Sequence, residues 1–374
     1  MKNSIVRNLR LMDLLLIVGC FLLLITGCQK TTDASAINAT TSTSDVQENS
    51  GYSLGNFAKV ILNANRTGYN ALHINPRLHN AWGMSESPGG TFWISAADGG
   101  VSFVYDKTGT AVISPVHIPS HEKNVPGNPT GQIFNGTADF VIPGTGATAK
   151  FIFASENGTI SGWNGGPSAI VVADRRKEDA SYKGIAMAYN NGANYLYATN
   201  FTKQKIDVFD KDFHHVPTQG FWDPNIPPHY APFNIRNIDS MLYVTYARQT
   251  KEGDDDSSGA GFGFVDVYWP NGTLAKHFAA HGTLNAPWGI AKAATRLLGK
   301  KALLIGNFGD GRINVFDWDG NFIGQLSVGG KPVVIDGLWG IESGVPNTSA
   351  AEQLYFTAGP NDEADGIFGF LYKK

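Results

Sequence analysis

Short runs of apolar and polar residues alternate along the chain from about residue 52 to its end. Each repeat starts with an apolar, β-rich run such as TFWISA, continues through a polar turn, and ends in an alternating run such as GVSFVYD. Alternation with a period of two, interrupted by Asp, Asn and Gly, is typical of antiparallel strands joined as hairpins. Helical periodicity is nearly absent from this part of the chain. The pattern therefore predicts an all-β fold.

A glycine-centred phrase recurs through the same region and is clearest in NAPWGI and DGLWGI. Its copies centre on six positions: Gly83, Gly131, Gly184, Asn234, Gly289 and Gly340. Neighbouring copies lie 48 to 55 residues apart. Four strands in a unit of this length predict a six-bladed β-propeller with four-stranded antiparallel blades. We expect the glycine to allow close approach of the innermost strands, and the Trp before it to fill the wedge between neighbouring blades.

The two ends of the repeat region predict how the ring closes. The last unit holds three strands, and an additional strand, FAKVILNAN at residues 57–65, precedes the first unit. A ring left open would expose a sheet edge on each side of the gap. We therefore predict that residues 57–65 supply the outer strand of the last blade.

The start of the chain resembles a bacterial lipoprotein signal. Three basic residues precede an apolar run at 14–25, which ends in LITGC with Cys28. This run is shorter than the roughly 20 apolar residues that span a bilayer. We expect cleavage before Cys28 and acylation of its sulfur, palmitate included, which would hold the mature protein on a lipid membrane. An ordinary secretory signal with an incidental cysteine is the alternative.

The segment after Cys28 is rich in Thr, Ser, Ala and Asn and has almost no large apolar side chains. Such a segment cannot bury enough surface to offset its ordering entropy. The predicted organisation is a signal peptide at 1–27, a disordered tether at 28–51 and the propeller at 52–374. Gln29 is not the Asp-type signal for retention at the inner membrane. We therefore expect a place in the cell envelope, at the outer membrane rather than the inner one.

Composition narrows the function without naming a reaction. The formal net charge of -3 gives no basic excess for a phosphate backbone, so we expect no nucleic-acid partner. Both cysteines, Cys20 and Cys28, lie in the first 28 residues, which leaves no thiolate ligand, disulfide or cysteine nucleophile in the propeller. The sequence also lacks P-loop and HExxH motifs.

Polar turn residues predict a site at one end of the propeller axis. In a four-stranded blade, the turn leading into the first strand lies on the same face as the turn between strands two and three. The first set of turns gives Asn80, Asn128, Ser181, Tyr230, Asn285 and Asp336. The second set gives Asp98, Glu156, Asn157, Asn200, 254–256, Asn307, Asp310, Asp362, Glu363 and Asp365. We predict an Asn/Asp-rich axial mouth whose ligand-binding residues are Asn80, Asn128, Tyr230, Asn285, Asp310 and Asp336.

Oxygen ligands from several blades suit Ca²⁺ or another hard divalent ion. The same residue types are also preferred in turns, where they hydrogen-bond locally, so both interpretations stay open. The acidic loop 251–261 is interpreted as solvated or as a calcium site, and His79 and His229 as rim residues or bases. Trp222 and Trp269 either pack within the blades or stack on sugar rings.

Several longer segments resemble a bacterial family of secreted propellers, some of which carry PEP-CTERM tails. They include FWDPNIPPHYAPFNI, GFGFVDVYWPNG, IGNFGDGRINVFD and LYFTAGPNDEADGIFG, and the resemblance covers roughly residues 52–372. More distantly, the blades are similar to those of NHL-repeat and gluconolactonase-like propellers. This second resemblance implies a metal that polarises a lactone carbonyl, held by Asn128, Asn285 and Asp336, with Asp336 as the candidate catalytic residue.

Two functions therefore stay open. The first is a membrane-anchored, extracytoplasmic propeller that binds a small molecule, a glycan or a protein at the mouth. The alternative is a metal-assisted lactonase or esterase that uses the same mouth. A fold of this kind hosts both, so the fold does not choose between them.

Overall fold

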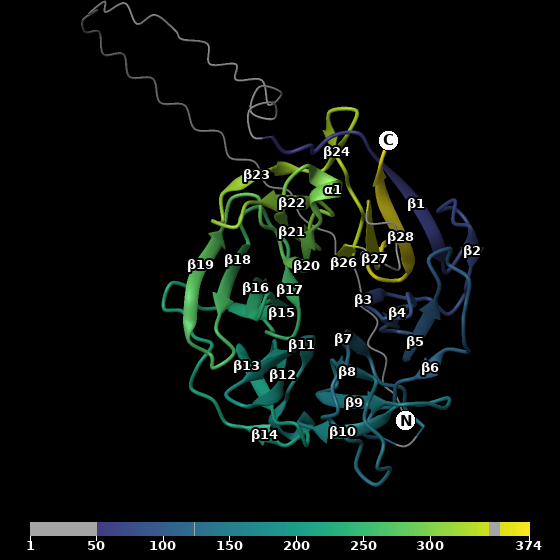
Figure 1. Cartoon of the computed structure of the whole chain (residues 1–374), viewed down its shortest axis with the longest axis vertical. Coiled ribbons are helices and arrows are strands. Elements are labelled where there is room, and N and C mark those ends of the chain that lie inside the picture. The colour runs from purple at the N-terminus through teal and green to yellow at the C-terminus, as the bar shows by residue number, and fades with distance from the viewer. Residues whose placement is uncertain (1–50, 123, 344–351) are drawn as a thin grey trace, which may run out of the picture. The chain divides into compact units, whose positions relative to one another are not determined.

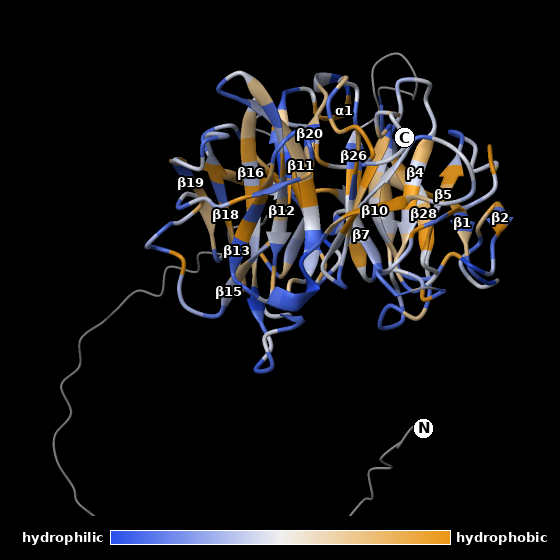
Figure 2. Cartoon of the chain, turned by 90° about the horizontal axis from the view of Figure 1, so that it is seen from below, coloured by the Kyte–Doolittle hydropathy of each residue, from blue (hydrophilic) through white to orange (hydrophobic). Residues whose placement is uncertain are grey.

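The computed structural model describes residues 51–122, 124–343 and 352–374. Six antiparallel sheets form a ring, so the predicted six-bladed β-propeller is confirmed (Figure 1). Viewed edge-on, apolar residues follow the strands and hydrophilic residues gather in the turns (Figure 2). The predicted signal peptide, Cys28 and the tether up to residue 50 lie outside the described residues.

Each blade has the expected four strands, from the axis outward. The innermost strands are β3 (Ala81–Glu86), β7 (Pro129–Phe134), β11 (Tyr182–Asn190), β15 (Tyr230–Ile238), β20 (Pro287–Ala293) and β26 (Leu338–Ser343). The second strands are β4 (Phe92–Ala96), β8 (Phe151–Ser155), β12 (Ala193–Asn200), β16 (Met241–Gln249), β21 (Ala302–Asn307) and β27 (Gln353–Ala358). The third strands are β5 (Val101–Tyr105), β9 (Thr159–Trp163), β13 (Lys205–Phe209), β18 (Gly263–Tyr268), β22 (Ile313–Phe316) and β28 (Ile367–Lys373).

The outer strands are β6 (Val116–His117), β10 (Ile170–Asp174), β14 (His215–Val216), β19 (Leu274–Ala280), β23 (Phe322–Gln325) and β1 (Phe57–Ala64). Small additions decorate this frame: β2 (His73–Ile74) beside β1, β17 (Asp256–Ser257) beside β16, and the hairpin of β24 (Ser327–Val328) and β25 (Lys331–Pro332). Helix is limited to one turn each at η1 (Arg176–Glu178) and α1 (Thr295–Leu298) within the described ranges.

The ring closes through β1, as the strand count predicted. β1 pairs antiparallel with β28, in a register that runs from Phe57 opposite Lys373 to Ala64 opposite Ile367. Figure 1 shows these two ends of the propeller side by side, in purple and yellow. Phe57 and Ala64 are fully buried, so the first strand seals the last blade with its own apolar side chains.

The repeated glycines form a narrow ring where the innermost strands meet. A Cβ atom added to Gly83 would lie 2.1 Å from the carbonyl oxygen of Thr130, and one added to Gly131 would lie 2.8 Å from the Cα of Gly184. Glycine is therefore required for the close approach of neighbouring strands. We call the six positions of the repeated phrase the glycine ring.

The Trp residues before these glycines pack between neighbouring blades, as expected, and also meet one another across the ring. Trp82 stacks on Trp339 with ring centroids 3.7 Å apart, and Trp288 meets both rings edge-on at 6.4 and 5.9 Å. Trp82 and Trp288 belong to blades 1 and 5, which are not neighbours, so the rings meet at the axis. The glycine ring brings the strands close enough for these side chains to meet. We call this buried group the aromatic plug: Trp82, Phe201, Phe233, Trp288, Phe308 and Trp339.

Candidate functional site

The two predicted sets of turns share one face of the propeller. In every blade a backbone N–H of the turn between strands two and three donates to a carbonyl of the turn leading into strand one. These bonds, 2.7 to 3.0 Å long, join Ala97 to Asn80, Glu156 to Asn128, Phe201 to Ser181, Gln249 to His229, Phe308 to Ala286 and Gly359 to Gly337. We call this side the mouth face.

Lys183 occupies the centre of the mouth face. Its side chain is only 3% exposed, and its Nζ atom forms an ion pair with Glu156 and lies 3.8 Å from Oδ1 of Asp255. The ammonium also lies 5.1 Å from the ring centroid of Trp82 in the aromatic plug. Burial alone would lower the pKa of Lys183, but Glu156 and Asp255 outweigh burial and raise the pKa. The ammonium therefore stays charged although it is buried.

Further carboxylates surround this ammonium. Burial and the charge of Asp255 raise the pKa of Glu363 to about 7, and the same two causes raise that of Asp256 to about 7. Burial and Glu156 raise the pKa of Asp98. Carboxylates from three blades, those of Glu156, of Asp255 and Asp256, and of Glu363, thus face one cation. Near neutral pH, Glu363 and Asp256 are partly protonated, which offsets part of the negative charge around Lys183.

Asn80 is the predicted ligand-binding residue that joins this cluster. Its Nδ2 atom donates to Oε2 of Glu363 at 2.5 Å, and its Oδ1 atom accepts from Nε1 of Trp339 at 2.8 Å. Both ends of the amide therefore already have partners. Asn80 links the aromatic plug to the carboxylates and fixes the position of Glu363.

The other predicted residues make contacts within their own surroundings. Oδ1 of Asn285 accepts from the N–H of Gly259 at 2.7 Å, and Oδ2 of the exposed Asp336 accepts from the N–H of Asn361 at 3.1 Å. The Asp310 carboxylate accepts from Nδ2 of Asn307, and the Tyr230 ring meets that of Phe264 edge-on. Asn128 lies on the mouth face, where its backbone carbonyl accepts a hydrogen bond from the N–H of Glu156 at 3.0 Å. The Asp310 bond lies within its own turn, whereas Asn285 and Asp336 each accept from a different turn.

The metal set of Asn128, Asn285 and Asp336 stays a prediction, and the described residues show what two of its members contact. Asn285 and Asp336, two of the three predicted ligands, use their side-chain oxygens on backbone N–H groups. The carboxylates that do converge already surround the ammonium of Lys183. The Lys183 ammonium therefore supplies the positive charge among the converging carboxylates, and no step through a metal at Asp336 follows from this geometry.

The remaining sequence candidates are spread over the surface. The acidic loop 251–261 supplies Asp255 and Asp256 to the mouth, so it is not simply solvated. Nδ1 of His79 lies 2.9 Å from the carbonyl oxygen of Ala364 at the rim. Trp222 and Trp269 are 71% and 53% exposed, so neither belongs to the packed core of a blade.

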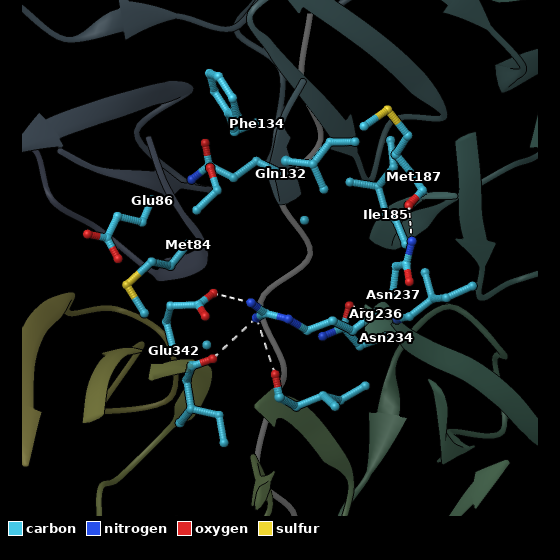
Figure 3. A pocket seen from close by; sticks show the side chains of 18 of the residues that line it. Met84, Glu86, Gln132, Phe134, Ile185, Met187, Asn234, Arg236, Asn237 and Glu342 are labelled. Atoms are coloured by element: carbon cyan, nitrogen blue, oxygen red, sulfur yellow. Dashed lines mark hydrogen bonds and ion pairs between the residues drawn. The ribbon is translucent and has the colours of Figure 1, made fainter. Parts of the chain in front are cut away.

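A cavity of about 510 Å³ lies at the opposite end of the axis, beyond the glycine ring (Figure 3). Residues that follow the glycine position in the innermost strands of all six blades line it, including Met84, Glu86, Gln132, Phe134, Met187, Arg236, Asn237, Ile290 and Glu342. The glycine ring and Trp288 form its inner end. We call it the axial cavity.

Arg236 is the dominant polar group of the axial cavity. Its guanidinium forms an ion pair with Glu342, and Nη1 donates to the carbonyl oxygens of Ile290 at 3.2 Å and Ile341 at 3.5 Å. Figure 3 shows the side chain reaching from β15 toward Glu342. A guanidinium carries five N–H donors, and these contacts use three of them. The group is therefore fixed in position and retains donors that can face a ligand.

Sequence reasoning missed this cavity because it collected residues before the glycine positions and not after them. A usable signal was present: Glu86, Arg236 and Glu342 are charged residues two or three places after the glycine position, in strands that otherwise look fully buried. Charged residues are rarely buried without a partner or a function.

Within the described part of the chain, the structure has no helix with the length and apolar character needed to cross a membrane. The predicted lipidation site, Cys28, lies outside that part. Membrane anchoring and the place in the cell envelope therefore stay predictions.

Comparisons with known proteins identify relatives at the level of sequence. No family model matches the chain. The uncharacterized protein R648 of Acanthamoeba polyphaga mimivirus is 32% identical over 324 residues, which cover 83% of this chain and 78% of the viral protein. The uncharacterized protein L690 of the same virus is 32% identical over 323 residues, which cover 81% of this chain and 82% of the relative.

Solved structures share the fold. A streptogramin B lyase matches with a TM-score of 0.51 and 14% identity, over 85% of this chain and 98% of that chain. A putative gluconolactonase matches with a TM-score of 0.50 and 13% identity, over 79% of this chain and 89% of that chain. Identities this low concern the fold alone. They agree with the expected likeness to gluconolactonase-like propellers, whereas the bacterial secreted family stays a prediction.

Proposed function

The chain belongs to the same family as the mimivirus proteins R648 and L690, and we propose that it is a binding protein that takes a small molecule into the axial cavity. The observation that carries this proposal is the axial cavity itself, with Arg236 fixed at its wall by Glu342. Small-molecule sites are typically concave, of about 300–1,000 Å³, with apolar walls and a few convergent polar groups. The axial cavity has this size, and its wall carries more polar surface than a typical site of this kind.

The shape of the axial cavity favours a small molecule over a glycan chain or a protein. The glycine ring and Trp288 form its inner end, so a long chain cannot pass through the axis. Its walls combine the thioethers and alkyl groups of Met84 and Met187 with the polar ends of Arg236 and Asn237. The expected ligand has both polar and apolar groups, with at least one hydrogen-bond acceptor for the Arg236 guanidinium.

A thermal-shift screen of small amphipathic compounds tests this proposal in solution. Met187→Trp should fill the cavity and weaken binding of any hit at least about tenfold, a loss of 1.4 kcal/mol. Met241→Trp is the matched control, because Met241 is a partly buried methionine that packs near Tyr243 and does not line the axial cavity. Hits that bind wild type and the Met187→Trp protein equally would contradict the proposal.

We further propose that Cys28 carries the lipid that anchors the protein outside the cytoplasm, at the outer rather than the inner membrane where the host has both. The basic, apolar and LITGC segments at the start of the chain support this proposal. Labelling with palmitate should modify wild type and not the Cys28→Ala variant. Equal labelling of both proteins would contradict lipidation at this residue.

A second candidate function uses the mouth face as a hydrolytic site for lactones or aryl esters. The observation in its favour is the charged, buried Lys183 beside Glu363 and Asp256, whose pKa values near 7 suit proton transfer at neutral pH. Hydrolysis of an aryl ester by wild type, lost in Glu363→Gln while the fold is retained, would favour it. No hydrolysis by wild type would reject it.

A further inference from the structure

Two buried carboxylates face one histidine in blade 4. The group lies away from the axis, at the third and outer strands of that blade. Asp266 lies on β18, His277 on β19, and Asp223 in the connection that precedes β15. Nδ1 of His277 lies 2.7 Å from Oδ1 of Asp266 and 2.9 Å from Oδ2 of Asp223. Both aspartate side chains are fully buried. The three facing atoms lie within 4.8 Å of one another.

The charges of this cluster do not balance with the histidine alone. Nδ1 carries one proton or one lone pair, so it cannot neutralise two carboxylates. The outer carboxylate oxygens are occupied: Asn225 donates its backbone N–H and its side-chain amide to Asp223, and the Tyr268 hydroxyl donates to Asp266. Among the described residues, His277 is the basic group in ion-pair contact with either carboxylate. A buried charge without a counter-ion is strongly unfavourable.

Blade 3 shows how the same position is neutralised elsewhere in this chain. Asp207 on β13 corresponds to Asp266, and Nε2 of His215 on β14 lies 3.4 Å from Oδ1 of Asp207, although His215 pairs with Phe209 rather than with Asp207. The Asp207 carboxylate, however, has the ammonium of Lys205 at 2.8 Å. In blade 4, Phe264 stands at the position of Lys205, and Asp223 adds a second carboxylate. Compared with blade 3, blade 4 therefore has no lysine at this position and has one carboxylate more.

Blade 5 has two neutral side chains at these positions. Asn314 on β22 and Gln325 on β23 take the two positions, and Nε2 of Gln325 donates to Oδ1 of Asn314 at 2.8 Å. Three consecutive blades thus place a polar pair here, and in blades 3 and 5 the pair is electrically complete. Of these three blades, blade 4 sets two buried carboxylates against a single imidazole.

We propose that Asp223, Asp266 and His277 bind a divalent transition-metal ion, for which Zn²⁺ is the best match. One imidazole nitrogen and two carboxylate oxygens are ordinary zinc ligands, and a water can complete four-coordination. Asn225 and Tyr268 hold the outer carboxylate oxygens, as outer partners of metal ligands usually do. The His277 side chain is one-third exposed, which gives the ion a route from solvent. The ion ties the connection between blades 3 and 4 to the outer strands of blade 4.

Titration of the chelator-treated full-length protein with ZnCl₂ tests this site. We expect one Zn²⁺ per chain by elemental analysis of the dialysed protein, heat release in calorimetry, and a higher melting temperature. The double variant Asp266→Asn/His277→Gln recreates the neutral pair of blade 5 and should fold. Its zinc affinity should fall by more than about a hundredfold. Loss of an outer-shell partner alone costs up to about a hundredfold, and this variant removes two direct ligands.

Controls separate this site from adventitious binding to surface histidines. His215→Gln changes the histidine that faces Asp207 in blade 3 and should leave one Zn²⁺ per chain with unchanged affinity. Should circular dichroism show the double variant unfolded, Asp223→Asn carries the test, with the same expected loss. No zinc bound by wild type, or equal affinity in wild type and a folded ligand variant, would overturn the proposal.

Discussion

Arg236 on β15 and Glu342 on β26 form an ion pair that joins blade 4 to blade 6 past blade 5, at the wall of the axial cavity. The same guanidinium donates to carbonyl oxygens of blades 5 and 6. One side chain therefore connects three innermost strands and fixes the polar side of the cavity. A rigid, partly buried guanidinium has already lost its rotamer freedom before a ligand arrives.

Breaking this pair on one side should destabilise the protein. Glu342 is 15% exposed, so Arg236→Met leaves a largely buried carboxylate without its partner. We expect a loss of about 2 kcal/mol in urea unfolding, less than the 3–5 kcal/mol of fully buried pairs because Arg236 is one-third exposed. Adding Glu342→Gln should restore part of that loss. If the loss in the double variant equals the sum of the two single-variant losses within about 0.5 kcal/mol, the two residues are not coupled.

The glycine ring should not tolerate a methyl group. Gly83→Ala places a Cβ atom 2.1 Å from a backbone oxygen, so a neighbouring strand has to move. Overpacking usually costs about 1–3 kcal/mol, and we expect the upper end because the atom met is backbone. Gly165→Ala is the control, since no atom lies within 4 Å of its added Cβ. Equal melting temperatures for the two variants would contradict the close approach.

The closing strand should carry a large share of the stability of the last blade. Phe57 is fully buried on β1, so Phe57→Ala should cost about 3–5 kcal/mol in the free energy of unfolding. Phe322 on the outer strand of blade 5 is 46% exposed and serves as the matched control. A Phe57→Ala loss no larger than that of Phe322→Ala would mean that β1 does not seal the ring.

The mouth face should make stability depend on pH. The folded-state pKa of Glu363 is about 7, above the ordinary carboxyl value of about 4. Between these values the folded protein keeps a proton that the unfolded chain has released, so stability falls as pH rises from about 4 to 7. Glu363→Gln removes this titration, so the variant should gain stability relative to wild type between pH 5 and pH 8.

Urea unfolding at several pH values measures this effect. Glu178→Gln replaces a half-exposed surface glutamate and should shift stability by the same small amount at pH 5 and pH 8. A stability difference between Glu363→Gln and wild type that stays constant over this range would contradict the raised pKa of Glu363.

Much of the fold could be predicted because it depends on spacing. The glycine phrase marks the innermost strand of each blade, and the surplus strand at 57–65 has one place to go once the blades are counted. The shared face of the two sets of turns follows from the same geometry. Periodicity is a property of the whole repeat, so no single substitution hides it.

The centre of the mouth could not be predicted in the same way. Lys183 stands at the position that Trp82, Trp288 and Trp339 occupy in other units, and strand alternation does not say that a lysine there is buried. Its partners, Glu156 and Asp255, come from other blades. Which turn residues meet at the axis depends on side-chain length and loop shape, which the repeat pattern does not contain.

The most direct test of the proposed small-molecule site is a crystal structure of the protein soaked with a library of small amphipathic compounds. We predict that bound compounds lie in the axial cavity, in contact with Arg236 and Met187, and that Met187→Trp crystals hold none there. Compounds bound at the mouth around Lys183, with none in the axial cavity of wild type, would contradict the account.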